Sequence, residues 1–295
     1  MNEILALQGH QEAVIAICGE ETILASASRD KTLRIWDCQT GDCIQVIKCE
    51  STILSLSLSN GKVAGGGIDY IARVWNVENG EQMCIFVGHK GWIRGVVLRP
   101  DGTLITASQD KTARLWSATG EMIDMQKHTD EVFAICGFAD GRVATGSGDA
   151  TVRIFEGSSL DRALHFHDKA VISLAQPSAS TLCSGAEDNT VVLWNLVAPM
   201  SNAILAVIDL ENVATVAIAS RFPYLAAGNE LYNIATTPPT MIATLPVSPA
   251  ALAFLETRKK EEETNNRDHN HTTSWFLAVA TTGKNRSTPR LWQLH

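Results

Sequence analysis

Side chains that take part in enzyme chemistry recur along this sequence in a fixed order: a histidine, then a hydroxyl, an aspartate and a tryptophan. A hydroxyl beside an imidazole that a carboxylate orients is the arrangement of nucleophilic hydrolases. The complete sets are His10, Ser26, Asp30 and Trp36; His89, Thr106, Asp110 and Trp116; and His167, Ser184, Asp188 and Trp194. No nucleophile motif stands out beside any of them. The sequence therefore predicts no catalytic residue.

Metal and phosphate chemistry are indicated no better. His165 with His167, and His269 with His271, have the spacing of metal ligands, but no cluster of cysteines or carboxylates accompanies either pair. The glycines of 65–67 are not followed by the Gly-Lys-Ser/Thr of a phosphate-binding loop. We expect no metal site, no cofactor and no small-molecule substrate.

The recurring residues belong to a repeat of roughly forty residues. Each repeat contains a short apolar run, a run of small residues, a turn with aspartate, a third run that ends in an aromatic residue, and a more polar fourth run. The closing aromatic residues are Trp36, Trp75, Trp116, Phe155 and Trp194. Short, evenly spaced strands separated by turns indicate an all-β array, in which stacked units bury the faces that one unit cannot bury alone.

With Gly9-His10, Gly88-His89 and the aspartate-to-tryptophan runs, the chain resembles the WD-repeat β-propeller family. The resemblance implies four strands in each blade. Weaker segments supply a sixth blade (213–218, 224–228 and 231–234) and three strands of a seventh (250–255, 275–280 and 289–294). The N-terminal strand 4–7 would complete the last blade. We expect one domain over 1–295, a seven-bladed propeller closed by the N-terminal strand, with a mobile insertion at 257–273.

The same resemblance implies that each histidine, hydroxyl, aspartate and tryptophan form a buried hydrogen-bonded chain that holds the strands in register. In blade four Phe155 cannot donate a hydrogen bond, and blade two lacks both the histidine and the hydroxyl, since Gly65 stands at the hydroxyl position. These residues are interpreted as scaffold.

The composition limits the partners and the cellular location. Of the 295 residues 45% are hydrophobic and 19% are charged, and the net charge is −8. A polyanion is therefore not attracted by the overall charge, and contact with nucleic acid requires a local basic patch. The seven scattered cysteines are typical of reduced, buried thiols. Without a signal peptide or an apolar run long enough for a membrane span, we expect a cytoplasmic protein.

Function is expected at the rim of one face, where the aspartate turns and the Gly-His loops meet. The candidate contact residues there are Arg29, Lys31, Lys48, Trp92, Arg94 and Lys111. They place positive charge on blades one to three, while the corresponding turns of blades four and five are neutral to acidic. A face with positive charge concentrated on one side suits an anionic partner. An exposed Trp92 suits a binding hot spot. The alternative is that the basic turns are solvated and idle.

Within the WD-repeat family the chain is most similar to the receptors for activated C kinase, as a divergent member. The similarity lies in four segments: Ser26–Thr32, Leu182–Asp188 with Trp194–Leu196, the part 221–227 of the sixth blade, which lacks a tryptophan, and the ending Arg290–Leu294. It implies a non-enzymatic scaffold that docks on the small (40S) ribosomal subunit, with Arg29, Lys31 and Lys48 on ribosomal RNA and other blades presented to ribosomal proteins and to signalling or translation factors. The alternative is an adaptor in another complex, such as a ubiquitin-ligase substrate receptor or a ubiquitin-binding or kinase-complex subunit.

Overall fold

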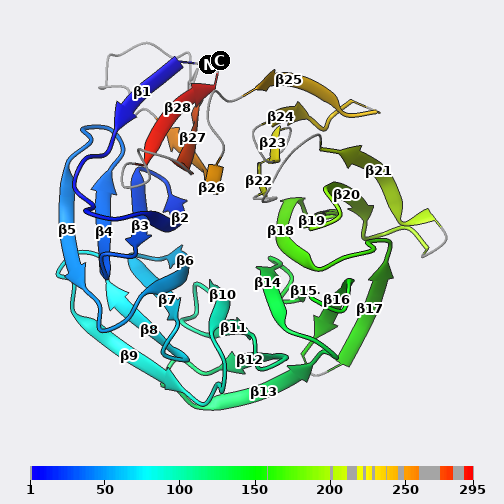
Figure 1. Ribbon diagram of the computed structural model, residues 1–295, viewed down its shortest axis with the longest axis horizontal. Coiled ribbons are helices and arrows are strands. Elements are labelled where there is room, and N and C mark those ends of the chain that lie inside the picture. Colours follow the sequence, from blue (N-terminus) through cyan, green and yellow to red (C-terminus); the bar gives the residue numbers. More distant parts are fainter. Residues whose placement is uncertain are drawn as a thin grey trace, which may run out of the picture.

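The computed structural model describes residues 2–157, 159–199, 202–210, 218–221, 224–227, 230–236, 238–244, 249–258, 273–281 and 289–294. In this part of the chain the strands form seven four-stranded sheets, each antiparallel, set around a central axis (Figure 1). The predicted all-β propeller is confirmed. We number the sheets as blades in chain order. Within each blade the strands are named below in their order from the axis to the circumference (Figure 1).

The strands of the first three blades follow one another without interruption. Blade one consists of β2 (Val14–Glu20), β3 (Ile23–Ser28), β4 (Thr32–Asp37) and β5 (Cys43–Lys48). Blade two consists of β6 (Ile53–Ser59), β7 (Lys62–Gly67), β8 (Ile71–Asn76) and β9 (Gln82–Val87). Blade three consists of β10 (Ile93–Leu98), β11 (Leu104–Ser108), β12 (Thr112–Trp116) and β13 (Met122–Lys127).

Blades four to six repeat this order. Blade four consists of β14 (Val132–Gly137), β15 (Val143–Ser147), β16 (Thr151–Glu156) and β17 (Ser159–His165). Blade five consists of β18 (Val171–Ser178), β19 (Thr181–Ala186), β20 (Thr190–Asn195) and β21 (Ile204–Asp209). Blade six consists of β22 (Ile218–Arg221), β23 (Tyr224–Ala227), β24 (Glu230–Asn233) and β25 (Thr240–Thr244); the rest of its predicted first strand, 213–217, lies outside the described residues.

The seventh sheet joins the two ends of the sequence. It consists of β26 (Pro249–Arg258), β27 (Thr273–Thr281), β28 (Arg290–Leu294) and β1 (Asn2–Ala6). β1 pairs with β28 from Asn2 opposite Gln293 to Ala6 opposite Arg290, and Leu7 N then donates to Pro289 O at 2.9 Å. Of the predicted insertion 257–273, residues 259–272 lie outside the described residues, while its two ends belong to β26 and β27.

The core lies between neighbouring blades. One apolar cluster spans blades one and two, another blades two and three, another blades four and five, and the cluster around Leu7 and Trp36 joins blade one to blade seven. Small residues in the second strands permit this close packing. At Gly66 in β7, for example, an added Cβ would collide with Ile93 of the next blade. Because each blade buries its faces against its neighbours, the recurring pattern specifies one continuous core.

One face of the propeller carries the loops of interest. It is formed by the loop that enters each innermost strand and by the turn between the second and third strands, and we call it the upper face. In blade one Arg29 N donates to Ala13 O at 2.9 Å and Gln11 N donates to Asp30 Oδ2 at 2.8 Å, so loop and turn lie side by side.

Candidate functional site

The recurring histidine, hydroxyl, aspartate and tryptophan lie together in blades one, three and five. In blade one His10 Nδ1 lies 3.1 Å from Asp30 Oδ2, and His10 Nε2 lies 2.8 Å from Ser26 Oγ. Trp36 Nε1 donates to the same hydroxyl at 2.8 Å. The corresponding three distances are 2.7, 2.7 and 2.9 Å in blade three and 3.0, 2.8 and 2.8 Å in blade five.

The direction of these hydrogen bonds follows from the donors. An indole N–H can only donate, so the hydroxyl accepts from the tryptophan and gives its own proton to histidine Nε2. Histidine Nδ1–H then donates to the aspartate. The hydroxyls of Ser26, Thr106 and Ser184 are completely buried. Because each hydroxyl is inaccessible and fully hydrogen-bonded, the geometry gives it no path to a substrate, and the networks act on the fold by tying strand, loop and turn together.

Burial and hydrogen bonding shift the pKa values in these networks. Burial lowers the pKa of His10, and likewise of His89, His128 and His167, so the neutral imidazole is favoured. For Asp30 burial acts to raise the pKa, but the hydrogen bonds from Thr32 and from the backbone of Gln11 outweigh it and lower the pKa to about 2. The neutral histidine therefore donates a hydrogen bond to the ionised aspartate, and the pair is a stable structural contact rather than an acid and base ready to transfer a proton.

A threonine two residues after each aspartate also belongs to the network, and the sequence analysis missed it. Its hydroxyl donates to the aspartate at 2.5–2.7 Å. The residues are Thr32, Thr112, Thr151 and Thr190. The Asp-x-Thr spacing was visible in the sequence and could have identified them.

Blade four keeps the histidine, hydroxyl and aspartate but has Phe155 in place of the tryptophan. His128 Nε2 lies 2.7 Å from Thr145 Oγ1 and Nδ1 lies 3.2 Å from Asp149 Oδ2, as in the complete sets. No indole reaches Thr145, because Phe155 stands in its place. Beside Phe155 and Thr145 there is a cavity of about 60 Å³, which is also lined by Ala113 and Leu115 of blade three.

Blade two replaces the network by a buried arginine. Arg73 is only 4% exposed, and its Nη1 lies 2.7 Å from Asp69 Oδ2 while its Nη2 donates to Glu50 Oε2 at 2.9 Å. Glu50 occupies the sequence position of the missing histidine, and Gly65 leaves room for Trp75, since an added Cβ would lie 3.1 Å from the indole. An ion-paired arginine thus links loop and turn where the sequence analysis noted only missing groups.

The predicted contact residues of blade one lie together on the upper face. Arg29, Lys31 and Lys48 are exposed, and none forms an ion pair with a described residue. Lys31 and Lys48 are brought side by side because Cys49 N donates to Lys31 O at 2.8 Å. We call these three residues the blade-one cations.

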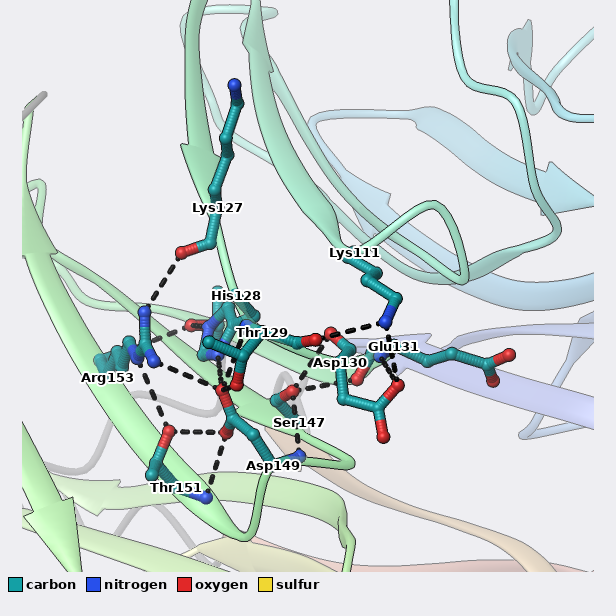
Figure 2. Close-up of polar contacts among 11 residues, drawn as sticks. Lys111, Lys127, His128, Thr129, Asp130, Glu131, Ser147, Asp149, Thr151 and Arg153 are labelled. Atoms are coloured by element: carbon teal, nitrogen blue, oxygen red, sulfur yellow. Dashed lines mark hydrogen bonds and ion pairs between the residues drawn. The ribbon is translucent and has the colours of Figure 1, made fainter.

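The predicted contact residues of blade three are engaged differently. Lys111 Nζ donates to Thr129 O at 3.0 Å and lies 3.4 Å from Asp130 Oδ1, both in the loop that enters blade four (Figure 2). Lys111 therefore contributes no free positive charge. Trp92 is 39% exposed, and its ring lies 5.1 Å from the guanidinium carbon of Arg94.

Other chemical groups can be placed within the described residues. All seven cysteines are free, and burial raises the pKa of Cys38 to about 12 and of Cys49 to about 11. Over the described ranges no group of three or more histidine, cysteine, aspartate or glutamate side chains is placed to hold a metal ion. His167 belongs to the blade-five network and His165 is exposed, whereas His269 and His271 lie outside the described residues. The described part of the chain also contains no helix that could span a membrane.

Comparison with known proteins agrees with this architecture. The family model "WD domain, G-beta repeat" matches residues 1–37, 80–117, 121–156 and 158–195, just over half of the chain. The chain is 32% identical over 201 residues to the DENN domain and WD repeat-containing protein SCD1 of Arabidopsis thaliana, covering 64% of this chain and 17% of that protein. It is 35% identical over 202 residues to the nuclear distribution protein nudF of Emericella nidulans, covering 65% and 42%. The chain thus spans less than half the length of either relative.

Among solved structures, that of U3-55K superimposes with a TM-score of 0.82 at 18% identity, covering 99% of this chain and 98% of that one. At this identity the likeness establishes the fold alone.

Proposed function

We propose that this chain, which belongs to the WD-repeat family, is a non-catalytic scaffold or adaptor that binds macromolecular partners through its upper face. One observation carries the proposal. The polar groups that could do chemistry are buried and hydrogen-bonded to one another, whereas the blade-one cations are exposed and have no ion-pair partner among the described residues. Groups of this kind serve recognition rather than bond making.

The finer form of the proposal is docking on the small ribosomal subunit, with the blade-one cations on phosphates of ribosomal RNA. Arg29, Lys31 and Lys48 favour it because they are free to neutralise phosphates, and Lys111 does not because Asp130 already holds it. Phosphate contacts of this kind weaken as salt rises. The resemblance to receptors for activated C kinase supports the same partner.

Cosedimentation with purified 40S subunits at rising salt tests this docking. We expect binding at low salt that is lost in the double variant Arg29→Glu with Lys31→Glu. The matched control reverses two exposed acids on blade five, Asp168→Lys with Glu187→Lys, and should bind as the wild type does. Wild-type protein that stays in the soluble fraction at low salt would rule out the ribosomal form.

A second candidate is an adaptor in another assembly, such as a ubiquitin-ligase, ubiquitin-binding or kinase complex. The exposed indole of Trp92 favours it, because rigid aromatic side chains are common anchors of protein interfaces. Affinity capture of the tagged chain should then yield one stoichiometric protein partner without ribosomal RNA, and Trp92→Ala should weaken the capture. A capture dominated by ribosomal subunits would contradict this candidate.

The proposal includes the architecture and location that we expect from the sequence: one seven-bladed ring closed by the N-terminal strand, in the cytoplasm. The pairing of β1 with β28 supports the ring closure, and the free cysteines agree with a reducing compartment. Removing residues 1–7 should lower the unfolding temperature markedly, and cell fractionation checks the location.

A further inference from the structure

Arg94 is held between two aromatic rings on the upper face. It is the second residue of β10, and its guanidinium carbon lies 5.1 Å from the ring centre of Trp92 and 5.8 Å from that of Phe133 in β14. Within the described residues the side chain of Arg94 forms no hydrogen bond and no ion pair, and its Nε is buried without an acceptor. The side chain is therefore fixed by stacking, while none of its N–H groups is used.

The two rings are anchored by the backbone around them. Trp92 O accepts from Gln109 N at 3.0 Å, and the preceding Gly91 O accepts from Ser108 Oγ at 3.0 Å. Gly91 also has no room for a side chain, since an added Cβ would lie 2.7 Å from Asp110 N. The loop that carries Trp92 is thus tied to the turn of its own blade, and this rigidity reduces the entropy that a ligand would have to remove.

The second ring is positioned by a glycine. Phe133 packs against Gly148 in the turn of blade four, where an added Cβ would lie 3.3 Å from Phe133 Cε2. Gly148 N in turn donates to Glu131 O at 2.8 Å. Stacking between planar rings leaves the edge of a guanidinium open, and this edge is the part that receives two oxygen atoms side by side.

The charges nearby select the kind of anion. Lys111 is paired with Asp130, and the Glu131 carboxylate accepts from Gln109 Nε2 at 3.1 Å. Lys111 and Asp130 neutralise each other, whereas Arg94 and the exposed Lys90 of the preceding loop form no ion pair with a described residue. A carboxylate with one charge matches one planar guanidinium in both charge and shape, because its two oxygen atoms can accept from two parallel N–H groups.

We infer that Trp92, Arg94 and Phe133 form a receptor for the carboxylate of an aspartate or glutamate in a protein partner, with the two rings packing on the apolar neighbours of that residue. The inference deepens the proposed scaffold function and rests on it. It assigns to blades three and four a contact with an acidic peptide, which is separate from the blade-one cations.

The test uses peptides selected on the purified chain. A library of random peptides on phage is selected on the wild-type protein and counter-selected on Arg94→Gln, and the enriched peptides are synthesised with a fluorophore. We expect the enriched sequences to share an aspartate or glutamate. Replacing that residue by asparagine or glutamine should weaken binding about ten- to hundredfold in fluorescence anisotropy, the range expected for a hydrogen-bonded charge pair.

Further variants separate recognition from folding. Arg94→Lys keeps the charge but not the planar fork and should weaken binding about as much as Arg94→Gln, while Phe133→Leu should weaken it less. All three should unfold at nearly the wild-type temperature. Lys62→Gln, which removes one positive charge at the start of β7, is the matched control and should leave peptide binding unchanged.

Three outcomes would overturn the inference: enriched peptides without an acidic residue, equal binding to Arg94→Gln, or a phosphoserine version of the peptide that binds more tightly than the acidic one. These outcomes leave the scaffold proposal intact if affinity capture still yields a partner. Capture of no partner by the wild-type chain would instead reject the scaffold proposal itself.

Discussion

Restoring the missing tryptophan of blade four should stabilise the protein. Phe155 lies opposite Val143 in the strand ladder, as Trp116 lies opposite Leu104 in blade three, and the hydroxyls of Thr145 and Thr106 occupy the same place two residues further on. In Phe155→Trp the indole should therefore donate to Thr145 as Trp116 Nε1 donates to Thr106 at 2.9 Å.

Two contributions set the expected gain in the free energy of unfolding. One additional buried hydrogen bond contributes about 1 kcal/mol. The indole also enters the cavity of about 60 Å³ beside Phe155, and at ~24 cal/mol per Å³ complete filling would contribute about 1.4 kcal/mol. Since an indole fills only part of this space, we expect a total gain of about 1–2 kcal/mol.

Urea unfolding followed by circular dichroism measures this gain as a higher midpoint with an unchanged slope. The reverse change in the intact blade, Trp116→Phe, should lower the midpoint by a similar amount. Measuring Thr145→Val both alone and together with Phe155→Trp separates the hydrogen bond from the filling of the cavity, because the loss of the contact with His128 is common to both. An unchanged or lower midpoint for Phe155→Trp, or a neutral Trp116→Phe, would refute the reasoning.

Other perturbations test the remaining networks and the packing between blades. The free energy of unfolding should decrease as the pH falls below about 6.5, because the buried histidines have a lowered pKa and take up protons more readily in the unfolded chain. The loss reaches about 1.4 kcal/mol per pH unit for each histidine. Thermal unfolding between pH 8 and pH 5 measures it. These histidines are His10, His89, His128 and His167. Arg73→Met should lower the free energy of unfolding by about 2–3 kcal/mol, because it leaves Asp69 without its buried partner. Glu50→Gln should lower it by less than about 1 kcal/mol, because Glu50 is 84% exposed. Similar urea midpoints for these two variants would contradict this assignment. Gly66→Ala should lower the free energy of unfolding by about 1–3 kcal/mol, because the added Cβ collides with Ile93. An unfolding temperature of Gly66→Ala equal to that of the wild type would contradict this expectation.

The repeat was readable from the sequence because its residues stand in fixed register. Each hydroxyl stands ten residues before its tryptophan, which lies two residues along the ladder from the residue opposite that hydroxyl. The family resemblance correctly implied that Ser26, Thr106 and Ser184 bond to their indoles. The all-β propeller class follows from the same repetition.

The contacts that replace a missing network could not be read in this way. Arg73 stands two residues before its tryptophan, as Arg114 does, yet it is buried between two acids whereas Arg114 is about an eighth exposed beside Asp110. The difference arises because the histidine of blade two is missing, and only the packed structure shows what replaces it.

The upper face was predicted only in part, for the same reason. Lys111 looked free in sequence, but Asp130 of the next blade holds it. The sequence analysis did not identify Phe133, because its contact with Arg94 arises between two strands of different blades. A single repeat carries no information about which neighbour its exposed side chains will meet.

The pairing of β1 with β28 has a consequence for biosynthesis. Among the described strands β1 is made before all the others and finds its partner only in β28, and contacts so distant in sequence form slowly. Blades one to six pair within themselves and can be assembled while translation continues, so the nascent propeller exposes an unpaired strand edge until the seventh sheet has been synthesised. That interval is when chaperones have the most to protect.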